Sequence, residues 1–312
     1  MEDLGSGSSA VNWGMPIYLP PLSRRRFLFC AGASLLPGWM ASAAPMDEDL
    51  VAILNDTHIG GKQKLDSPIP QHLTTTVDYL LRLEKRPAAV IINGDLALRD
   101  GQPEDYALFA QLIRPLREAG MAVHLTMGNH DEREVFYRVM EDQRPSSAPV
   151  LARHVAVVET RHATFVLLDS LKATMIAEGD LGAEQISWLV KTLDVHAAKP
   201  AVIVAHHNPR LGGDPQHFPG GLVDSQPLWD LFQQRRQVKA YVHGHIHHWG
   251  LAKHEGVHIA NTPAVSYVAN PATSTTGWTM ARIRPGGMTL TTHTHLADHP
   301  WNNQSHDLVW RS

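Results

Sequence analysis

The stretch LVAILNDTH, residues 50–58, joins an apolar run to a carboxylate and an imidazole. A short apolar run that ends in polar residues is typical of a strand buried on both faces of a sheet. Asp56 and His58 follow this run two residues apart, so an extended backbone places them on the same side. The stretch therefore predicts a buried strand that ends in a carboxylate and an imidazole able to hold one cation.

Short apolar runs and helical patterns alternate along the chain from Leu50 onward. The predicted buried strands are Leu50–Leu54, Ala88–Ile92, Ala122–Thr126, Phe165–Leu168, Ala201–Ala205 and Ala240–Val242. The predicted helices are Leu73–Leu83, Pro103–Glu118, Glu184–Leu193 and Asp224–Gln233. Proline suits the first turn of a helix, which supports a start at Pro103. This alternation predicts an α/β fold in a single domain over residues 45–312.

The C-terminal part of that domain has a different pattern. Two apolar-polar stretches, Trp278–Arg284 and Met288–Leu296, flank the turn sequence Pro285-Gly286-Gly287. Alternating stretches on either side of such a turn predict a β-hairpin. The last dozen residues, rich in Asn, His and Trp, form a tail with no predicted element.

Polar residues cluster directly after the predicted strands. Besides Asp56 and His58, the strand ends carry Gly94-Asp95, Gly128-Asn129-His130-Asp131, His206-His207 and Gly244-His245-Ile246-His247. Open α/β sheets bind their ligands at the carboxyl ends of the strands. A given string of four residues arises by chance on the order of once per thousand chains of this size, from residue frequencies of a few per cent. The ordered set therefore indicates one functional site rather than unrelated turns.

The composition limits what kind of site this is. The chain of 312 residues has 20 His and one Cys, with a formal net charge of -4. One Cys excludes a disulfide framework and a thiolate metal cluster, so imidazole and carboxylate groups must hold any metal. Such ligands favour a reactive hydrolytic centre over a closed structural site. The absence of net positive charge and of a basic stretch argues against nucleic-acid binding.

The N-terminus resembles a twin-arginine signal peptide. Ser23-Arg24-Arg25-Arg26-Phe27-Leu28 precedes an apolar run over residues 29–40 and the small residues Ala41-Ser42-Ala43-Ala44. The run is too short and too rich in Gly, Ser and Pro for a stable membrane anchor. Residues 1–44 are therefore expected to be a signal, with Met15 as the true start. This predicts contact with the twin-arginine export machinery and a periplasmic or extracellular location.

The ordered motifs from Asp56 to His247 resemble those of the calcineurin-like metallophosphoesterase family. The resemblance implies a four-layer αββα sandwich, in which two mixed β-sheets are flanked by helices, with a dinuclear metal site at the strand ends. Carried over by position, Asp95 would bridge two metal ions. One ion would be held by Asp56, His58 and His247, and the other by Asn129, His206 and His245.

The family chemistry agrees with these residue types. Two cations bind phosphate oxygens and lower the pKa of a bound water, which gives a hydroxide nucleophile near neutral pH. The resemblance leaves His130 free of metal, so that it can donate a proton to the leaving oxygen, with Asp131 orienting its ring. His207 and Arg99 are the candidates for substrate binding. The mixed ligand set accepts Fe, Mn, Zn or Co, and the sequence does not choose among them.

Position-by-position comparison narrows the subfamily. Leu98 stands where purple acid phosphatases carry a Tyr ligand. The chain is instead most similar to bacterial cyclic-nucleotide phosphodiesterases and glycerophosphodiesterases, through Gly94-Asp95-Leu96, Pro103-Glu104-x-Tyr106 and Leu181 to Leu189. The expected substrate is therefore a small extracytoplasmic phosphodiester. The loop Pro209–Val223 either lines the substrate pocket or is a surface insertion.

Two alternatives stay open from the sequence. A phosphomonoesterase would use the same scaffold, and a non-catalytic exported metal-binding protein would also combine many His with almost no Cys. The second class usually carries its His in tracts or on a flexible segment. Here the candidate ligands stand at strand ends beside His130, which favours the enzyme.

Overall fold

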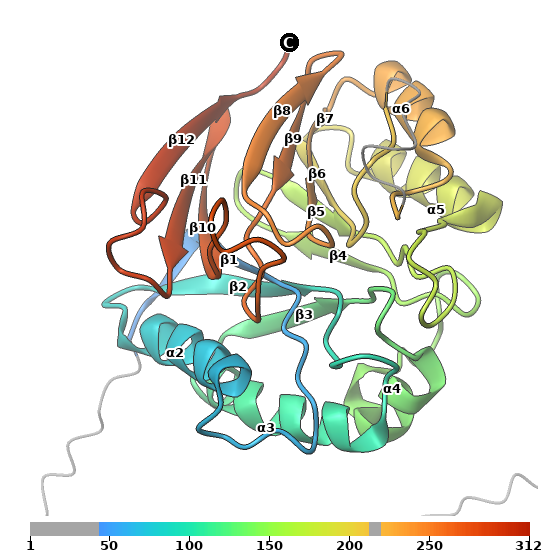
Figure 1. The fold of residues 1–312 in the computed structure, drawn as a ribbon. Helices are drawn as coiled ribbons and strands as arrows, with labels where there is room; N and C mark the ends of the chain where they lie inside the picture. The colour runs from blue at the N-terminus through green and yellow to red at the C-terminus, as the bar shows by residue number, and fades with distance from the viewer. Residues whose placement is uncertain (1–43, 212–219) are drawn as a thin grey trace, which may run out of the picture. The chain divides into compact units, whose positions relative to one another are not determined.

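The computed structural model describes residues 44–211 and 220–312, which form two β-sheets and their covering helices (Figure 1). The predicted signal, residues 1–44, lies outside the described residues except for Ala44. Among the described residues, no helix combines the length and the apolar character needed to cross a membrane.

The first sheet has the strand order β12-β11-β10-β1-β2-β3. Its strands are β1 (Met46–Asn55), β2 (Arg86–Asn93), β3 (Ala122–Thr126), β10 (Gly277–Arg284), β11 (Gly287–Thr294) and β12 (Gln304–Val309). β1, β2 and β3 run parallel, whereas β10 to β12 are antiparallel additions on the other side of β1. The sheet is therefore mixed, and its parallel strands deliver their carboxyl ends to one edge.

The second sheet has the order β4-β5-β6-β7-β9-β8. Its strands are β4 (Ala156–Glu159), β5 (Thr164–Leu167), β6 (Ala201–Val204), β7 (Val238–His243), β8 (Gly250–His254) and β9 (Val257–Asn261). The central strands β5, β6, β7 and β9 are parallel, and β4 and β8 are antiparallel edges. This sheet is mixed as well.

Helices cover the outer face of each sheet (Figure 1). The first sheet carries α2 (Pro68–Arg82), α3 (Pro103–Glu118) and α4 (Arg133–Val139), with a 3-10 turn at Glu141–Gln143. The second carries α5 (Gly182–Val195) and α6 (Ser225–Gln234). One apolar core lies between the sheets and one lies beneath each helical layer. The expected four-layer αββα sandwich is confirmed.

The opening strand shows why its apolar run is continuous. In β1, Val51 and Ile53 pack into the core between the sheets. Ala52 and Leu54 alternate with them and pack into the core beneath α2 and α3. A strand with a core on both faces has no side on which polar residues are favoured, so alternation disappears from its sequence.

The predicted elements are all present, and Pro103–Glu118 coincides with α3. The strands that the sequence did not predict are β4, β8 and β12, which lie at sheet edges, and β9, which lies inside the second sheet next to β8. An edge strand such as β12, with the sequence QSHDLV, is mostly solvent-exposed and therefore lacks the apolar run used to find the central strands.

Candidate metal centre

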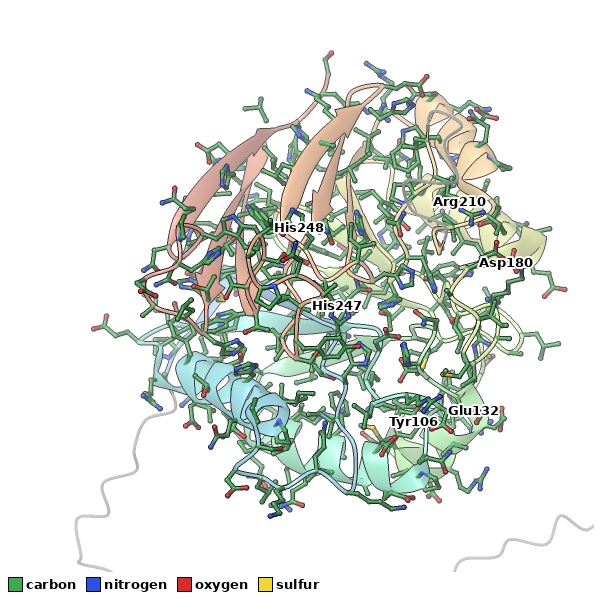
Figure 2. The ribbon with its side chains drawn as sticks, in the orientation of Figure 1. Tyr106, Glu132, Asp180, Arg210, His247 and His248 are labelled. Carbon is green, nitrogen blue, oxygen red and sulfur yellow. The ribbon has the colours of Figure 1, made fainter. Side chains whose placement is uncertain are left out.

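The polar residues that follow the parallel strands of both sheets meet at one place. Asp56 and His58 follow β1, Asp95 follows β2, and Asn129 and His130 follow β3. The second sheet adds His206 after β6 and the pair His245 and His247 after β7. His247 lies close to the middle of the view in Figure 2. The site is thus assembled from the facing ends of two sheets.

Four buried side chains form one group of candidate ligands. Asp56, His58, Asp95 and His247 each offer an atom, and these atoms all lie within 4.8 Å of one another. The His58 Nε2 atom is 3.2 Å from His247 Nε2 and 3.4 Å from Asp95 Oδ2. His247 Nε2 is 3.4 Å from Asp56 Oδ1. Two carboxylates and two imidazoles therefore face a common point.

A second group adjoins the first. His206, His207 and His245 offer ring nitrogens that also lie within 4.8 Å of one another. Asp95 Oδ2 is 3.3 Å from His206 Nε2, so this carboxylate stands between the two groups. The Oδ1 atom of the buried Asn129 has no hydrogen-bond partner among the described residues. This is the spatial arrangement expected for a bridging Asp95, although the division of ligands between two ions remains a prediction.

The main chain is strained at the candidate ligands. Left-handed backbone occurs at Asp56 (φ 53°), His58 (φ 45°), Asp95 (φ 48°), His245 (φ 70°) and His247 (φ 49°). Each such residue costs on the order of 1–3 kcal/mol and persists only where its surroundings fix it. Strain concentrated on five candidate ligands indicates that the fold places these side chains at a cost to its own stability.

Hydrogen bonds and glycines hold the strained turns. The Asp56 carboxylate accepts hydrogen bonds from the main-chain N–H of His245 at 3.1 and 3.2 Å. A side chain at Gly128 would place its Cβ 2.2 Å from Asp95 Oδ1, and one at Gly244 would place it 2.5 Å from Asp56 Oδ2. Both motifs therefore need glycine so that a neighbouring loop can approach a carboxylate.

Burial and charge set the protonation of these groups. Burial would raise the pKa of Asp95, but the His206 ring outweighs it and holds that pKa well below the ordinary value. Burial would lower the pKa of His206, yet the Asp95 carboxylate raises it to about 9. Burial lowers the pKa of His58 to about 4 and that of His245 to about 3. The pKa of His247 is also raised, because the Asp56 carboxylate outweighs the effect of burial. The site thus combines carboxylates with two imidazoles of lowered pKa and two of raised pKa.

The rings present the donor atoms that a metal ion requires. His58, His206 and His247 use Nδ1 to donate to main-chain carbonyls of Leu98, Asn93 and Tyr267, at 3.1, 3.1 and 2.7 Å. Such bonds fix the tautomer and leave Nε2 for a metal. The buried Nε2 atoms of His206 and His207 have no hydrogen-bond partner among the described residues. Neutral imidazole, carboxylate and amide oxygen fit Fe, Mn, Zn or Co.

His130 borders the site without joining either group. Its main-chain N–H donates to Asp95 Oδ1 at 2.8 Å, and its Nδ1 donates to the Arg99 carbonyl at 2.7 Å. The ring lies 4.9 Å from that of His58, centroid to centroid. It lines a cavity of about 350 Å³ together with Asp95, Asn129 and His247. His130 is therefore placed to reach a molecule bound at the candidate ligands.

Asp131 has a different role from the one expected. The ring of His130 is oriented by the carbonyl of Arg99, so Asp131 does not supply that contact. Its buried carboxylate instead accepts N–H bonds from Leu96, Ala97 and Gly128 at 3.1, 3.1 and 2.9 Å. Burial and the charge of Asp95 raise the pKa of Asp131 to about 7. Asp131 thus joins the loops after β2 and β3.

The two substrate-binding candidates lie away from the cavity wall. The Arg99 side chain is exposed and borders a separate hollow with Lys62 and Gln63. His207 is fully buried, and its Nδ1 lies 2.8 Å from Ser170 Oγ. Neither is among the described residues that line the cavity at Asp95 and His130.

Two features of the site were missed from the sequence. The Tyr267 ring is 42% exposed, lines the cavity, and lies 4.5 Å from the His247 ring. It belongs to a loop after β9 that carries no motif. Asp169, directly after the predicted fourth strand, binds Arg133 through two contacts of 2.6 and 2.8 Å. Its position at a strand end was a signal that could have revealed it.

A third feature missed from the sequence is the pair of hydrogen bonds made by the Tyr106 hydroxyl. Tyr106 and Glu132, both labelled in Figure 2, are joined by the Glu132 main-chain N–H, which donates to the Tyr106 hydroxyl at 2.7 Å. The same hydroxyl donates to Asp131 at 3.2 Å. Tyr106 therefore connects α3 to the loop that carries Asn129 and His130.

Comparison with known proteins gives the family. The chain is 26% identical to a cAMP/cGMP dual specificity phosphodiesterase of Mycobacterium tuberculosis, over 80% of this chain and 77% of the relative. It is 27% identical to the 3',5'-cyclic adenosine monophosphate phosphodiesterase CpdA of Pseudomonas aeruginosa, over 78% and 85%. It is also 27% identical to the glycerophosphodiester phosphodiesterase GpdQ of Enterobacter lignolyticus, over 69% and 77%.

A solved structure and a family model complete the comparison. The fold is similar to that of a dimetal phosphatase from Danio rerio, with a TM-score of 0.62 and 13% identity, over 84% of this chain and 99% of that one. Residues 50–249 match the family model described as calcineurin-like phosphoesterase. The chain therefore belongs to the calcineurin-like phosphoesterase family and is a metal-dependent phosphoester hydrolase.

Proposed function

We propose that this protein is an exported enzyme that hydrolyses a small phosphodiester at a dinuclear metal site. The observation that carries the catalytic part is the position of Asp95, whose carboxylate lies 3.4 Å from His58 Nε2 in one ligand group and 3.3 Å from His206 Nε2 in the other. The relatives named as phosphodiesterases support the type of bond.

The residues divide the chemistry between them. Asp56, His58 and His247 would hold one ion, Asn129, His206 and His245 the other, and Asp95 both. The bound ions would supply charge that neutralises phosphate oxygens and activates a water. In its protonated form, His130 would keep the Nδ1–H hydrogen bond to the Arg99 carbonyl and would donate its Nε2 proton to the leaving oxygen.

The cavity wall favours a diester over a monoester. The described residues that line it include no Lys or Arg. A phosphomonoester is a dianion near neutral pH, so it leaves more negative charge than a diester for basic side chains to balance beside the bound ions. A diester carries one negative charge and a second organic substituent, for which Ile246 and the half-exposed ring of Tyr267 offer contact surface. The phosphomonoesterase alternative lacks this support.

The ester preference is testable with a matched substrate pair. Metal-free protein is reloaded with Mn, Fe, Zn or Co and assayed on bis-p-nitrophenyl phosphate and p-nitrophenyl phosphate. We expect kcat/KM for the diester to exceed that for the monoester at least tenfold, about 1.4 kcal/mol in transition-state binding. A preference for the monoester overturns the diester proposal, and turnover of neither ester with any metal favours a binding protein.

Export is proposed from residues 1–44 alone. The Arg24-Arg25 pair precedes the apolar run at residues 29–40, as in signals that carry folded proteins. Substituting Arg24→Lys together with Arg25→Lys should trap the protein inside the cell, as shown by fractionation. The lysine pair keeps the charge, so normal export of this variant would contradict the twin-arginine route.

A further inference from the structure

A second cavity lies next to the metal centre, on the outer face of the second sheet. Its volume is about 440 Å³, within the range of small-molecule sites. Its floor comes from β7, β8 and β9, and Pro209 to Leu211 form part of its wall. Ile246 lines this cavity and also the one that contains Asp95 and His130. The two cavities therefore share Ile246 in their walls.

The floor of this cavity contains an unpaired amide. Asn261 is 5% exposed, and neither its Oδ1 nor its Nδ2 has a hydrogen-bond partner among the described residues. The nearby Asn208 is 2% exposed, and its Oδ1 likewise has none in the described chain. Leaving a buried polar group unpaired destabilises a fold, so three such atoms at one cavity call for an explanation.

Strand register explains why Asn261 borders the cavity. Val257 and Ile259 of β9 pack toward the core beneath α5 and α6, and alternation puts Asn261 on that same face beyond them. Asn261 pairs with His243 of β7 on one side and with Gly250 of β8 on the other. A Cβ added at Gly250 would meet no atom within 4 Å. The missing side chain at Gly250 therefore leaves open space beside Asn261.

Among the described residues that line the cavity, the one Lys or Arg side chain is paired with a carboxylate, and the Asn261 amide carries no charge. Arg210, also labelled in Figure 2, pairs with Glu178 at 3.2 Å. The Nδ1 of His243 donates to the Gly244 carbonyl at 3.0 Å. The aliphatic walls include Leu251 and Ile259.

These groups match one kind of ligand. We propose that this cavity binds a neutral, planar heterocycle with adjacent donor and acceptor atoms, the chemistry of a purine base, through the Asn261 amide. An Asn amide pairs in this way with the amino group and N7 of adenine. Aliphatic walls suit the faces of such a ring. Two sources supply this chemistry: the base of a nucleotide whose phosphate lies at the metal centre, or a separate nucleoside.

Calorimetric titration with adenosine tests the site without any turnover. Adenosine carries no phosphate, so the experiment stands even if the proposed hydrolysis fails. We expect metal-free and metal-loaded protein to bind it, and 7-deazaadenosine, which lacks the N7 acceptor, to bind at least tenfold more weakly. No binding of adenosine at millimolar concentration, or equal binding of the two nucleosides, overturns the proposal.

Two variants place the ligand. Asn261→Leu should weaken adenosine binding at least tenfold and raise Tm, because it removes an unpaired amide. Gly250→Val should also block binding, because its side chain would enter the open space beside Asn261, where an added Cβ meets no protein atom within 4 Å. Gly286→Val is the matched control, since a Cβ there also meets no atom within 4 Å and the residue lies in the β10–β11 turn. Wild-type binding by Gly250→Val overturns the assignment.

Inhibition kinetics separate the two sources. If the base of a nucleotide substrate occupies this cavity, adenosine should be a competitive inhibitor of cyclic AMP hydrolysis by the metal-loaded enzyme. Binding of adenosine without competition assigns the site to a separate nucleoside. Both results keep the site itself, which the binding titration decides.

Discussion

Two histidine clusters of this molecule use the same side chain in opposite ways. At the metal centre, the buried Nε2 atoms of His206 and His207 have no hydrogen-bond partner in the described chain, and two carboxylates stand among the rings. Between α2 and the β10–β11 hairpin, His72 and His295 stack with ring centroids 4.3 Å apart. There His295 uses Nδ1 for Thr276 Oγ1 at 3.0 Å and Nε2 for the His72 carbonyl at 2.9 Å.

The difference shows what separates a reactive histidine from a structural one. In the α2–hairpin cluster, both nitrogens of His295 are used within the fold. At the metal centre, the Nδ1 atoms of His58, His206 and His247 are fixed by carbonyls, and their Nε2 atoms are left for a ligand. Strained backbone adds to the contrast, because His58, His245 and His247 have positive φ values whereas His72 and His295 do not.

The largest effect is expected from Asp95→Asn. The amide removes a negative charge from the point where both ligand groups meet. We expect loss of at least one ion per chain by elemental analysis and a fall in kcat/KM of more than about 10³-fold, consistent with the several kcal/mol that metal-ion catalysis supplies. His295→Asn is the control and should keep its metal. Full metal content in Asp95→Asn would contradict a bridging role.

His130→Ala should separate catalysis from metal binding. The side chain binds the Arg99 carbonyl and packs against the His58 ring without belonging to either ligand group, so metal content should stay at the wild-type level. Loss of a proton donor should lower kcat by about 10²–10⁴-fold. Asp131→Asn provides a contrast, because it disturbs three N–H bonds to one carboxylate and should lower Tm. Parallel loss of metal and activity in His130→Ala would instead make His130 a ligand.

The α2–hairpin cluster should show itself in the pH dependence of stability. Burial and the neighbouring His72 lower the pKa of His295 from 6.5 to about 4. As the pH falls, His295 therefore takes up a proton in the unfolded chain before it does so in the folded chain. Its contribution to the free energy of unfolding is complete above pH 6.5 and is lost as the pH falls through 4. That loss amounts to up to about 3 kcal/mol. Chemical unfolding of metal-free His295→Asn should show a smaller loss over this range, and an unchanged loss would refute the assignment.

Tyr267 should give the smallest effect. Its ring borders the cavity beside His247, and it is not a ligand. Tyr267→Ala should raise KM for bis-p-nitrophenyl phosphate about 3- to 10-fold, in line with about 0.5–1.5 kcal/mol for an aromatic contact. Tyr267→Phe keeps the ring and should remain close to wild type. Equal KM values for all three proteins would remove Tyr267 from the substrate site.

The central strands and the candidate ligands were predictable because both leave local patterns. An apolar run such as Leu50–Leu54 marks a strand buried on both faces, and Asp56 and His58 stand directly after it. The residue types at the strand ends, together with the family resemblance, pointed to side chains that the fold brings together, and their role as ligands stays a prediction. The four-layer arrangement followed from that resemblance.

Other features depend on contacts between distant segments. Asp95 and Asp131 both end glycine-containing motifs, yet only the folded loops show that Asp131 collects N–H groups from Leu96, Ala97 and Gly128. Tyr267 reaches His247 across 20 residues of sequence. The open space beside Asn261 depends on its pairing with Gly250 of β8, which has no side chain. Sequence spacing carries no record of such placements.

Titration of metal-free protein with Mn²⁺ during hydrolysis of bis-p-nitrophenyl phosphate tests the central claim most directly. Because Asp95 stands between two ligand groups, activity should rise until two ions are bound per chain and then stay constant. Because the pKa of His206 is raised to about 9, binding of Mn²⁺ near pH 7.5 should also release about one proton or more from the protein. Saturation at two ions without turnover, or full activity with a single ion, would contradict a dinuclear phosphodiesterase.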